Sequence, residues 1–142
     1  KLQPIKFICN METKDDYLNR HLKSYAAISY INKNTLRDAK IRLIFLAGRG
    51  YYLDRIYEDD PSFGMNFIRD LVANSHDNKA FQNHIRSFNY THLLIRKDLF
   101  VKYLHDNYSQ EKINNFLQQM RKATEMIYED NNYEVYKIIS QN

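Results

Sequence analysis

Apolar and polar residues alternate along the chain with two different periods, which divide it into helical and extended segments. Amphipathic helices are expected where apolar residues recur at helical spacing, and strands where they form short continuous or strictly alternating runs. On this basis the predicted helices lie around residues 13–22, 27–31, 63–72, 80–88, 99–104 and 113–127, and the predicted strands around residues 40–47, 55–57, 90–95 and 133–139.

Short polar residues mark the expected ends of these helices. Thr13 and Asp16 have the spacing of a capping box. Asp77, Asp98 and Ser109 each stand where a side-chain oxygen can accept a hydrogen bond from an amide of the first turn, and we expect each to cap a helix. The asparagine pair at 131–132 is expected to end the longest helix.

The order of the elements predicts an α/β fold. Residues 40–47 form an almost continuous apolar run, typical of a strand buried on both faces of a parallel sheet. Segment 133–139 alternates instead, which favours a strand at the sheet edge, with an antiparallel orientation allowed. We predict one domain over residues 1–142, a three-layer sandwich with a mostly parallel sheet of about four strands. Residues 1–12 are expected to be an extended connector.

Composition narrows the class of protein without naming an activity. The 142 residues contain one cysteine, Cys9, which excludes an internal disulfide framework and a multi-cysteine zinc site. The five histidines show none of the HxxxH or HExxH spacings of metal sites, so no metal or cofactor is expected. The net charge is only +4, and charges of both signs are interleaved, so we expect no nucleic-acid partner.

The densest polar and aromatic cluster follows the first predicted strand. Gly48 and Gly50 stand where doubly wound folds bind phosphates, although the third glycine of the dinucleotide motif is replaced by Leu53. An arginine there can hold a phosphate and a tyrosine ring can stack on a sugar or base. The candidate ligand-binding residues are Arg49, Tyr51, Tyr52, Asp54 and Arg55.

Two interpretations of this cluster stay open. In the first, the chain is a freestanding α/β domain that binds a small phosphorylated ligand or nucleotide at loop 48–54. In the second, an ion pair between Asp54 and an arginine pins the loop, and the glycines only allow a tight turn. No catalytic residue is expected in either case, because the chain lacks a serine nucleophile elbow and its adjacent carboxylates stand in capping and turn sequences.

Five short segments, taken in order, form a pattern beyond secondary structure. It resembles the extramembrane C-terminal domain of multi-pass bacterial membrane glycosyltransferases that use polyprenyl-phosphate sugars, akin to the protein mannosyltransferase and aminoarabinose transferase group. The resemblance covers about residues 5–139, and its most specific parts are an Arg-X-Tyr-Tyr-X-Asp run and a Thr-His-Leu-Leu strand. The segments are Asp16-Tyr17-Leu18, Ala27-Ile28-X-Tyr30-Ile31-Asn32, Asp38-Ala39-Lys40-Ile41, Arg49-Gly-Tyr51-Tyr52-Leu53-Asp54-Arg55 and Tyr90-Thr91-His92-Leu93-Leu94-Ile95.

The resemblance implies a division of labour. The catalytic acid of such enzymes lies in an early extramembrane loop among the membrane spans, so no catalytic residue carries over to this chain. The resemblance implies a non-catalytic domain on the periplasmic side of the bacterial membrane, adjacent to it but not inserted, and tethered by upstream transmembrane helices through residues 1–12. Its implied partners are that transmembrane region and a glycan or lipid-linked acceptor, which residues 49–55 would help to dock.

Overall fold

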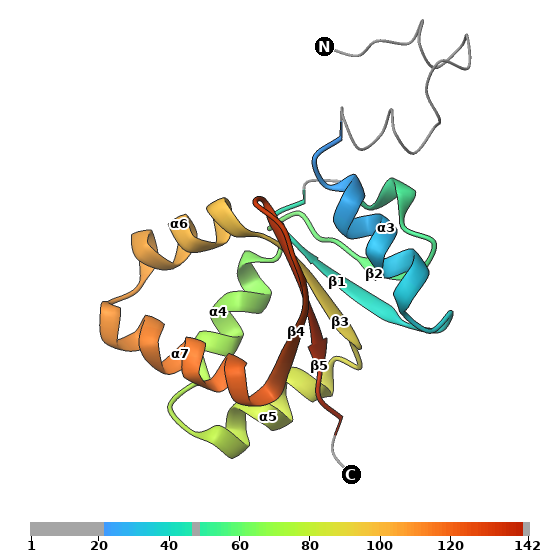
Figure 1. The fold of residues 1–142 in the computed structure, drawn as a ribbon. Coiled ribbons are helices and arrows are strands. Elements are labelled where there is room, and N and C mark those ends of the chain that lie inside the picture. The colour runs from blue at the N-terminus through green and yellow to red at the C-terminus, as the bar shows by residue number, and fades with distance from the viewer. Residues whose placement is uncertain (1–21, 47–48, 141–142) are drawn as a thin grey trace, which may run out of the picture.

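The structure, a computed structural model, describes residues 22–46 and 49–140. Within these residues the strands form one five-stranded sheet, and the helices lie around it (Figure 1). The strands are β1 (Lys40–Ile44), β2 (Ile56–Glu58), β3 (His92–Arg96), β4 (Thr124–Glu129) and β5 (Tyr133–Ile138). The helices are α3 (Tyr25–Asn34), α4 (Met65–Ala73), α5 (Asn78–Ser87), α6 (Lys97–Asn107) and α7 (Gln110–Ala123), with a 3₁₀ turn, η1 (Arg49–Tyr52).

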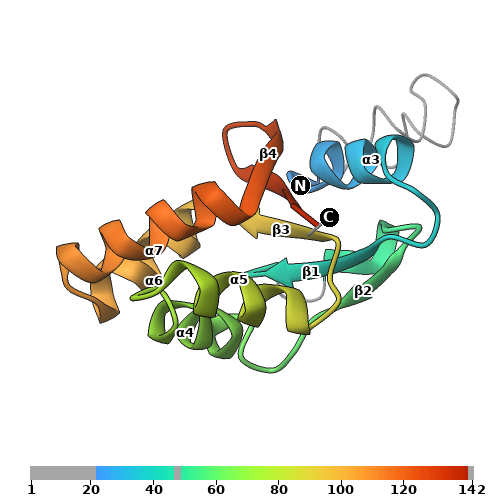
Figure 2. The same cartoon turned by 90° about the horizontal axis from the view of Figure 1, so that it is seen from below.

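The sheet is mixed and has helices on both faces. Its strand order is β2-β1-β3-β5-β4. β1 runs parallel to β2 and β3, whereas β5 runs antiparallel to β3 and β4. α3 lies over one face and α4 to α7 cover the other (Figure 2). The predicted α/β sandwich is therefore confirmed, with five strands rather than about four.

Burial on both faces explains the apolar run of β1. Leu43 packs with Leu94 in the core beneath α3. Ile44 packs with Leu93 and Ile95 in the core beneath the opposite helices. All five side chains are 0% exposed, and burying each one contributes about 1.5–3 kcal/mol. Both strands therefore lie inside the sheet, and the prediction that the strand in 40–47 is buried on both faces is confirmed for β1.

Two of the predicted helix caps are confirmed. The Asp77 carboxylate accepts a hydrogen bond from a first-turn amide of α5 at 3.0 Å, and the Ser109 hydroxyl accepts one from α7 at 3.3 Å. The cap at Asp98 is wrong, because α6 begins at Lys97 and Asp98 lies within the first turn. There its charge still favours the positive end of the helix dipole. The helix predicted at 13–22 and the connector 1–12 lie almost wholly outside the described residues.

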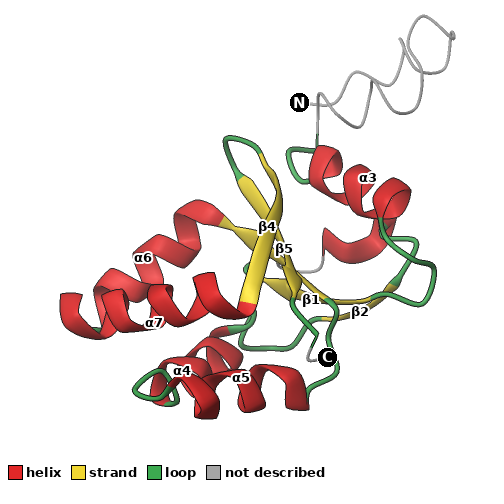
Figure 3. Ribbon diagram, turned by 60° about the horizontal axis from the view of Figure 1, so that its bottom comes forward, coloured by secondary structure: helices red, strands yellow, loops and turns green. Residues whose placement is uncertain are grey.

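The prediction that the longest helix continues to residue 127 is wrong. α7 ends at Ala123, and the next six residues form β4. β4 and β5 make a hairpin (Figure 3) whose turn is held by Asp130, since its carboxylate accepts two backbone amides, each at 2.8 Å. The threonine, isoleucine and tyrosine of β4 favour a strand once this partner is present.

The extra strand also corrects the predicted place of the last one. β5 lies between β3 and β4, so the edge strand is β4. The antiparallel orientation of β5, which its sequence allowed, is confirmed. Its alternating pattern arises because the exposed Lys137 interrupts an otherwise buried or half-buried strand. The resulting sequence resembles that of an edge strand with one face in solvent.

We predict that Gly64→Ala lowers the free energy of unfolding by about 1–3 kcal/mol. Gly64 has a φ of +92°, and a Cβ there would lie 3.1 Å from the Cα of Ile44 in β1. Urea unfolding measures the loss. The control is Asn89→Gly: exposed Asn89 also has a left-handed φ of 61°, so glycine there should leave stability unchanged or raise it. Equal losses in the two variants would contradict the prediction.

Candidate functional site

The loop predicted to bind a ligand returns along the sheet instead of staying at one end. Because β2 is parallel to β1 and Ile56 pairs with Lys40, the connection must travel back to the amino end of β1 before β2 begins. The expectation that the whole cluster sits at the carboxyl end of the first strand is therefore wrong for Asp54 and Arg55. The side chains of Arg49 and Tyr51 lie outside the described ones.

Gly50 is required by close packing in this loop. A Cβ at Gly50 would lie 2.7 Å from the ring of Tyr57 and 2.8 Å from Cδ1 of Leu43. Leu43 is fully buried, so it has little room to move away. The glycine thus lets the η1 turn lie against β1 and β2, which is a structural reason for its presence.

Arg55 is a buried arginine that closes the carboxyl end of α3. Its side chain is 3% exposed. One guanidinium nitrogen donates to the carbonyls of Asn32 and Thr35, each at 2.8 Å, and Nε donates to the Thr35 hydroxyl at 3.0 Å. These carbonyls lie at the end of the helix, where they lack partners within it. Arg55 therefore stabilises α3 in the manner of a side-chain cap.

Tyr52 and Asp54 complete the same structure. Asn32 donates to the Tyr52 carbonyl at 3.0 Å and accepts from the Asp54 amide at 2.7 Å. The Asp54 carboxylate pairs with the exposed Arg37 at 2.7 Å. We call Asn32, Thr35, Tyr52, Asp54 and Arg55 the Arg55 lock. The Asp54–Arg37 pair is the kind of contact that the second interpretation expects, but it is exposed, and the buried hydrogen bonds in this region are those of Arg55.

A second charged cluster, which the sequence analysis missed, surrounds Arg42 of β1. The Arg42 side chain is 3% exposed. It donates to Glu58 at 3.0 Å and to Asp60, and it lies over the rings of Phe67 at 5.4 Å and Tyr90 at 5.8 Å. Two features of the sequence could have indicated this cluster. Arg42 interrupts a continuous apolar run, and an acidic run, residues 58–60, follows soon after it.

The Arg42 cluster shifts the pKa values of its members. Burial raises the pKa of Asp60, but hydrogen bonds from Ser62, Arg42 and the Gly64 amide outweigh it and lower that pKa to about 2. Burial and the hydrogen bond from the Tyr90 hydroxyl to Glu58, 2.7 Å long, raise the pKa of Tyr90 to about 12. At neutral pH the cluster therefore holds an ionised Asp60 beside a protonated Tyr90.

Comparison with known proteins identifies no family for this chain. No protein-family model matches the chain, and no curated protein sequence matches it. Among the described residues, no three His, Cys, Asp or Glu side chains are grouped to hold a metal ion. Within that same part of the chain, no helix has the length and apolar character of a membrane span. The fold thus defines the class, an open-sheet α/β domain.

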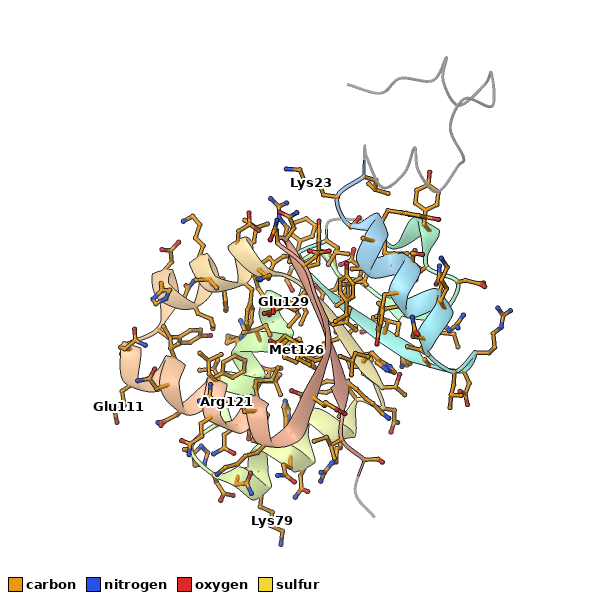
Figure 4. The ribbon with its side chains drawn as sticks, in the orientation of Figure 1. Lys23, Lys79, Glu111, Arg121, Met126 and Glu129 are labelled. Carbon is orange, nitrogen blue, oxygen red and sulfur yellow. The ribbon has the colours of Figure 1, made fainter. Side chains whose placement is uncertain are left out.

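Both clusters use their charges within the protein. The Arg55 lock joins α3 to the segment before β2, and the Arg42 cluster joins β1 to β2 and to the turn before α4. The outer helices instead point charges of both signs into solvent, as Lys79 of α5 and Glu111 of α7 show (Figure 4). Arg55 is thus engaged within the protein, whereas binding by Arg49, Tyr51, Tyr52 and Asp54 stays a prediction.

We predict that Arg55→Gln lowers the free energy of unfolding by about 2–4 kcal/mol, because it leaves half-buried acceptors at the end of α3 without donors. Chemical denaturation measures the loss. The matched control is Arg37→Gln: its ion pair with Asp54 is exposed, with 80% of the Arg37 side chain accessible, so the change should stay within about 0.5 kcal/mol. A small effect of Arg55→Gln would contradict the lock.

We also predict that Asp60 makes stability depend on pH in the acid range. The pKa of Asp60 is about 2 in the folded chain, against an ordinary value of 3.8. Its contribution is therefore complete above pH 3.8 and is lost as pH falls toward 2. The stability difference between wild type and Asp60→Asn should shrink by about 1–2 kcal/mol between about pH 6 and about pH 2. Thermal unfolding across that range measures it, and a constant difference would contradict the assignment.

Proposed function

We propose that this chain is the extramembrane, non-catalytic domain of a polyprenyl-phosphate-dependent membrane glycosyltransferase. The observation that carries the proposal is the meeting of two segments on which the resemblance depends. Asn32 ends one segment and Arg55 ends another, and the Arg55 guanidinium bonds the Asn32 carbonyl at 2.8 Å. Residues that are distant in sequence thus form one structural unit, which supports a resemblance of the whole fold.

The proposal assigns these residues to architecture and the chemistry to the parent protein. Arg55 is held at the end of α3 through its guanidinium, and Tyr52 and Asp54 are held there through their backbone groups. Such fixed groups suit a rigid platform better than a reacting centre, which needs a free acid, base or nucleophile. The domain would sit on the periplasmic face of the bacterial membrane, tethered by upstream helices, and help to dock a glycan or lipid-linked acceptor.

The alternative, a freestanding domain that binds a small phosphorylated ligand, has one observation in its favour. β1 lies between β2 and β3 in the sheet. The chain passes from β1 to β2 on one side and then crosses to β3 on the other side. The carboxyl end of β1 is therefore a switch point, where open α/β sheets bind ligands. This alternative requires that Arg49→Ala abolish stabilisation by nucleotides and sugar phosphates, which is about 2.7 kcal/mol at 100 times the dissociation constant.

The size and membrane partitioning of the native gene product test the proposal. We predict that an antibody against this domain detects a band far above 17.2 kDa that stays with membranes after an alkaline wash, because such a wash does not extract transmembrane helices. A soluble periplasmic protein and a known integral membrane protein serve as controls. A soluble band near 17.2 kDa would refute the membrane parent. Turnover of a polyprenyl-phosphate sugar by the purified chain would refute the non-catalytic role.

A further inference from the structure

A row of three titratable side chains crosses the sheet on its α3 face. His92 of β3 pairs in register with Lys137 of β5, and Lys137 pairs with Glu125 of β4. Residues paired in this way point to the same face, with Cβ atoms about 4.5–5.5 Å apart. His92 is two residues from Leu94, and Lys137 two from Val135, both of which pack in the core beneath α3. The row therefore faces the same side as α3.

This row forms the floor of a groove with a volume of about 570 Å³. The end of α3 and the segment after it form a wall, through Tyr30, Lys33 and Asp38 among others. Leu36 and Ile127 add apolar surface, and the Leu36 side chain is 79% exposed. A groove of this size falls within the range of about 300–1,000 Å³ that holds small-molecule ligands.

His92 is oriented as a neutral hydrogen-bonding group. Its residue is only 7% exposed, and burial and the nearby Lys137 lower its pKa. Its Nδ1 lies 2.8 Å from the Thr91 hydroxyl, which already accepts the Lys40 amide at 2.9 Å. The Thr91 hydroxyl has one proton, and both Nδ1 and the Lys40 carbonyl, which is 3.2 Å away, are within reach as its acceptor. The imidazole proton is on Nε2 when the hydroxyl donates to Nδ1, and on Nδ1 when the hydroxyl donates to the carbonyl. In either tautomer Nε2 makes no hydrogen bond within the described part of the chain, and it can donate or accept one according to the tautomer.

Four charged side chains near His92 also have no bonding partner within the described residues. Lys33, Lys137, Asp38 and Glu125 line the groove, yet within the described residues none of them makes an ion pair or a side-chain hydrogen bond. The two ammonium groups suit an anionic group. The two carboxylates suit hydroxyl donors, and the apolar wall suits the carbon face of a sugar ring.

We propose that this groove binds an anionic monosaccharide, a sugar that carries a phosphate or a carboxylate. The site goes beyond the proposed function, because it needs no membrane tether and involves none of residues 49–55. It faces β3, β5 and β4, whereas Arg55 precedes β2 at the other edge of the sheet. The site can therefore stand or fail independently of the membrane parent.

Isothermal titration of the 142-residue chain tests the site. The probes are glucose 1-phosphate and glucuronate, with glucose and inorganic phosphate as the neutral and the sugar-free controls. We expect at least one anionic sugar to bind and both controls to bind at least about tenfold more weakly, a difference of about 1.4 kcal/mol. The two anionic probes distinguish a phosphate from a carboxylate ligand.

Variants assign the binding to the groove. Lys33→Gln and Glu125→Gln, both of exposed residues outside the core, should each weaken binding about tenfold or more while thermal unfolding stays unchanged. Lys33 is preferred to Lys137, because Lys137 also borders a second cavity of about 340 Å³. The matched control is Lys122→Gln, an exposed lysine of α7 outside the groove, which should leave binding unchanged.

The imidazole resonances, observed by NMR during titration with glucose 1-phosphate, give the location directly. The His92 signal, assigned from a His92→Gln sample, should shift, and those of the exposed His76 and His105 should not. A shift of His76 alone would place the anion in the cavity between α4 and α7, which Arg69 and Lys112 line, and would overturn the proposal. Absence of binding, equal binding of inorganic phosphate, or equal weakening by Lys122→Gln would also overturn it.

Discussion

A guanidinium buried in the parallel part of the sheet is the constraint on which half of this fold depends. Burying an unpaired charge would cost more than the whole stability of a small domain, so Arg42 must find counter-charges. It finds Glu58 on β2 and Asp60 just after it. All three residues of β2 are exposed, so apolar burial contributes little to its attachment. The ion pairs and the backbone ladder therefore hold this edge strand against β1.

The same cluster organises the entry to α4, where left-handed backbone is concentrated. Phe45, Phe63 and Gly64 all have positive φ values, and the Phe45 amide bonds the Phe63 carbonyl at 2.8 Å. The Asp60 carboxylate accepts from the Ser62 hydroxyl and the Gly64 amide. A single ionised side chain thus pairs with Arg42 and fixes the turn, and its hydrogen bonds offset strain that costs about 1–3 kcal/mol at each non-glycine position.

The sequence predicted what local pattern controls and missed what distant contacts control. The buried runs of β1 and β3 and the caps at Asp77 and Ser109 are local signals, and each was confirmed. The last predicted helix was extended too far because Thr124 to Glu129 keeps helical spacing, and only pairing with β5 turns it into a strand. The Arg42 cluster was missed for the same reason, since its members come from segments whose register the sequence does not specify.

The position of the loop before β2 was also predicted wrongly. β2 runs parallel to β1, so the chain must return to the amino end of β1, and Arg55 lies there. The direction of β2 is a property of the whole sheet and has no local signal in the sequence.

Arg55 and the proposed sugar groove are linked through the end of α3. Arg55 fixes Thr35 by its hydroxyl and its carbonyl, and Thr35 lines the groove next to Leu36. The floor of the groove belongs to three strands paired in fixed register. Backbone pairing therefore positions the floor, and the hydrogen bonds of Arg55 position the wall at Thr35. A site built from a held helix end and a paired sheet is pre-organised, and an anionic sugar then loses less free energy to ordering the protein when it binds. Arg55, one of the candidate binding residues in the sequence, thus holds the helix end that borders the proposed groove.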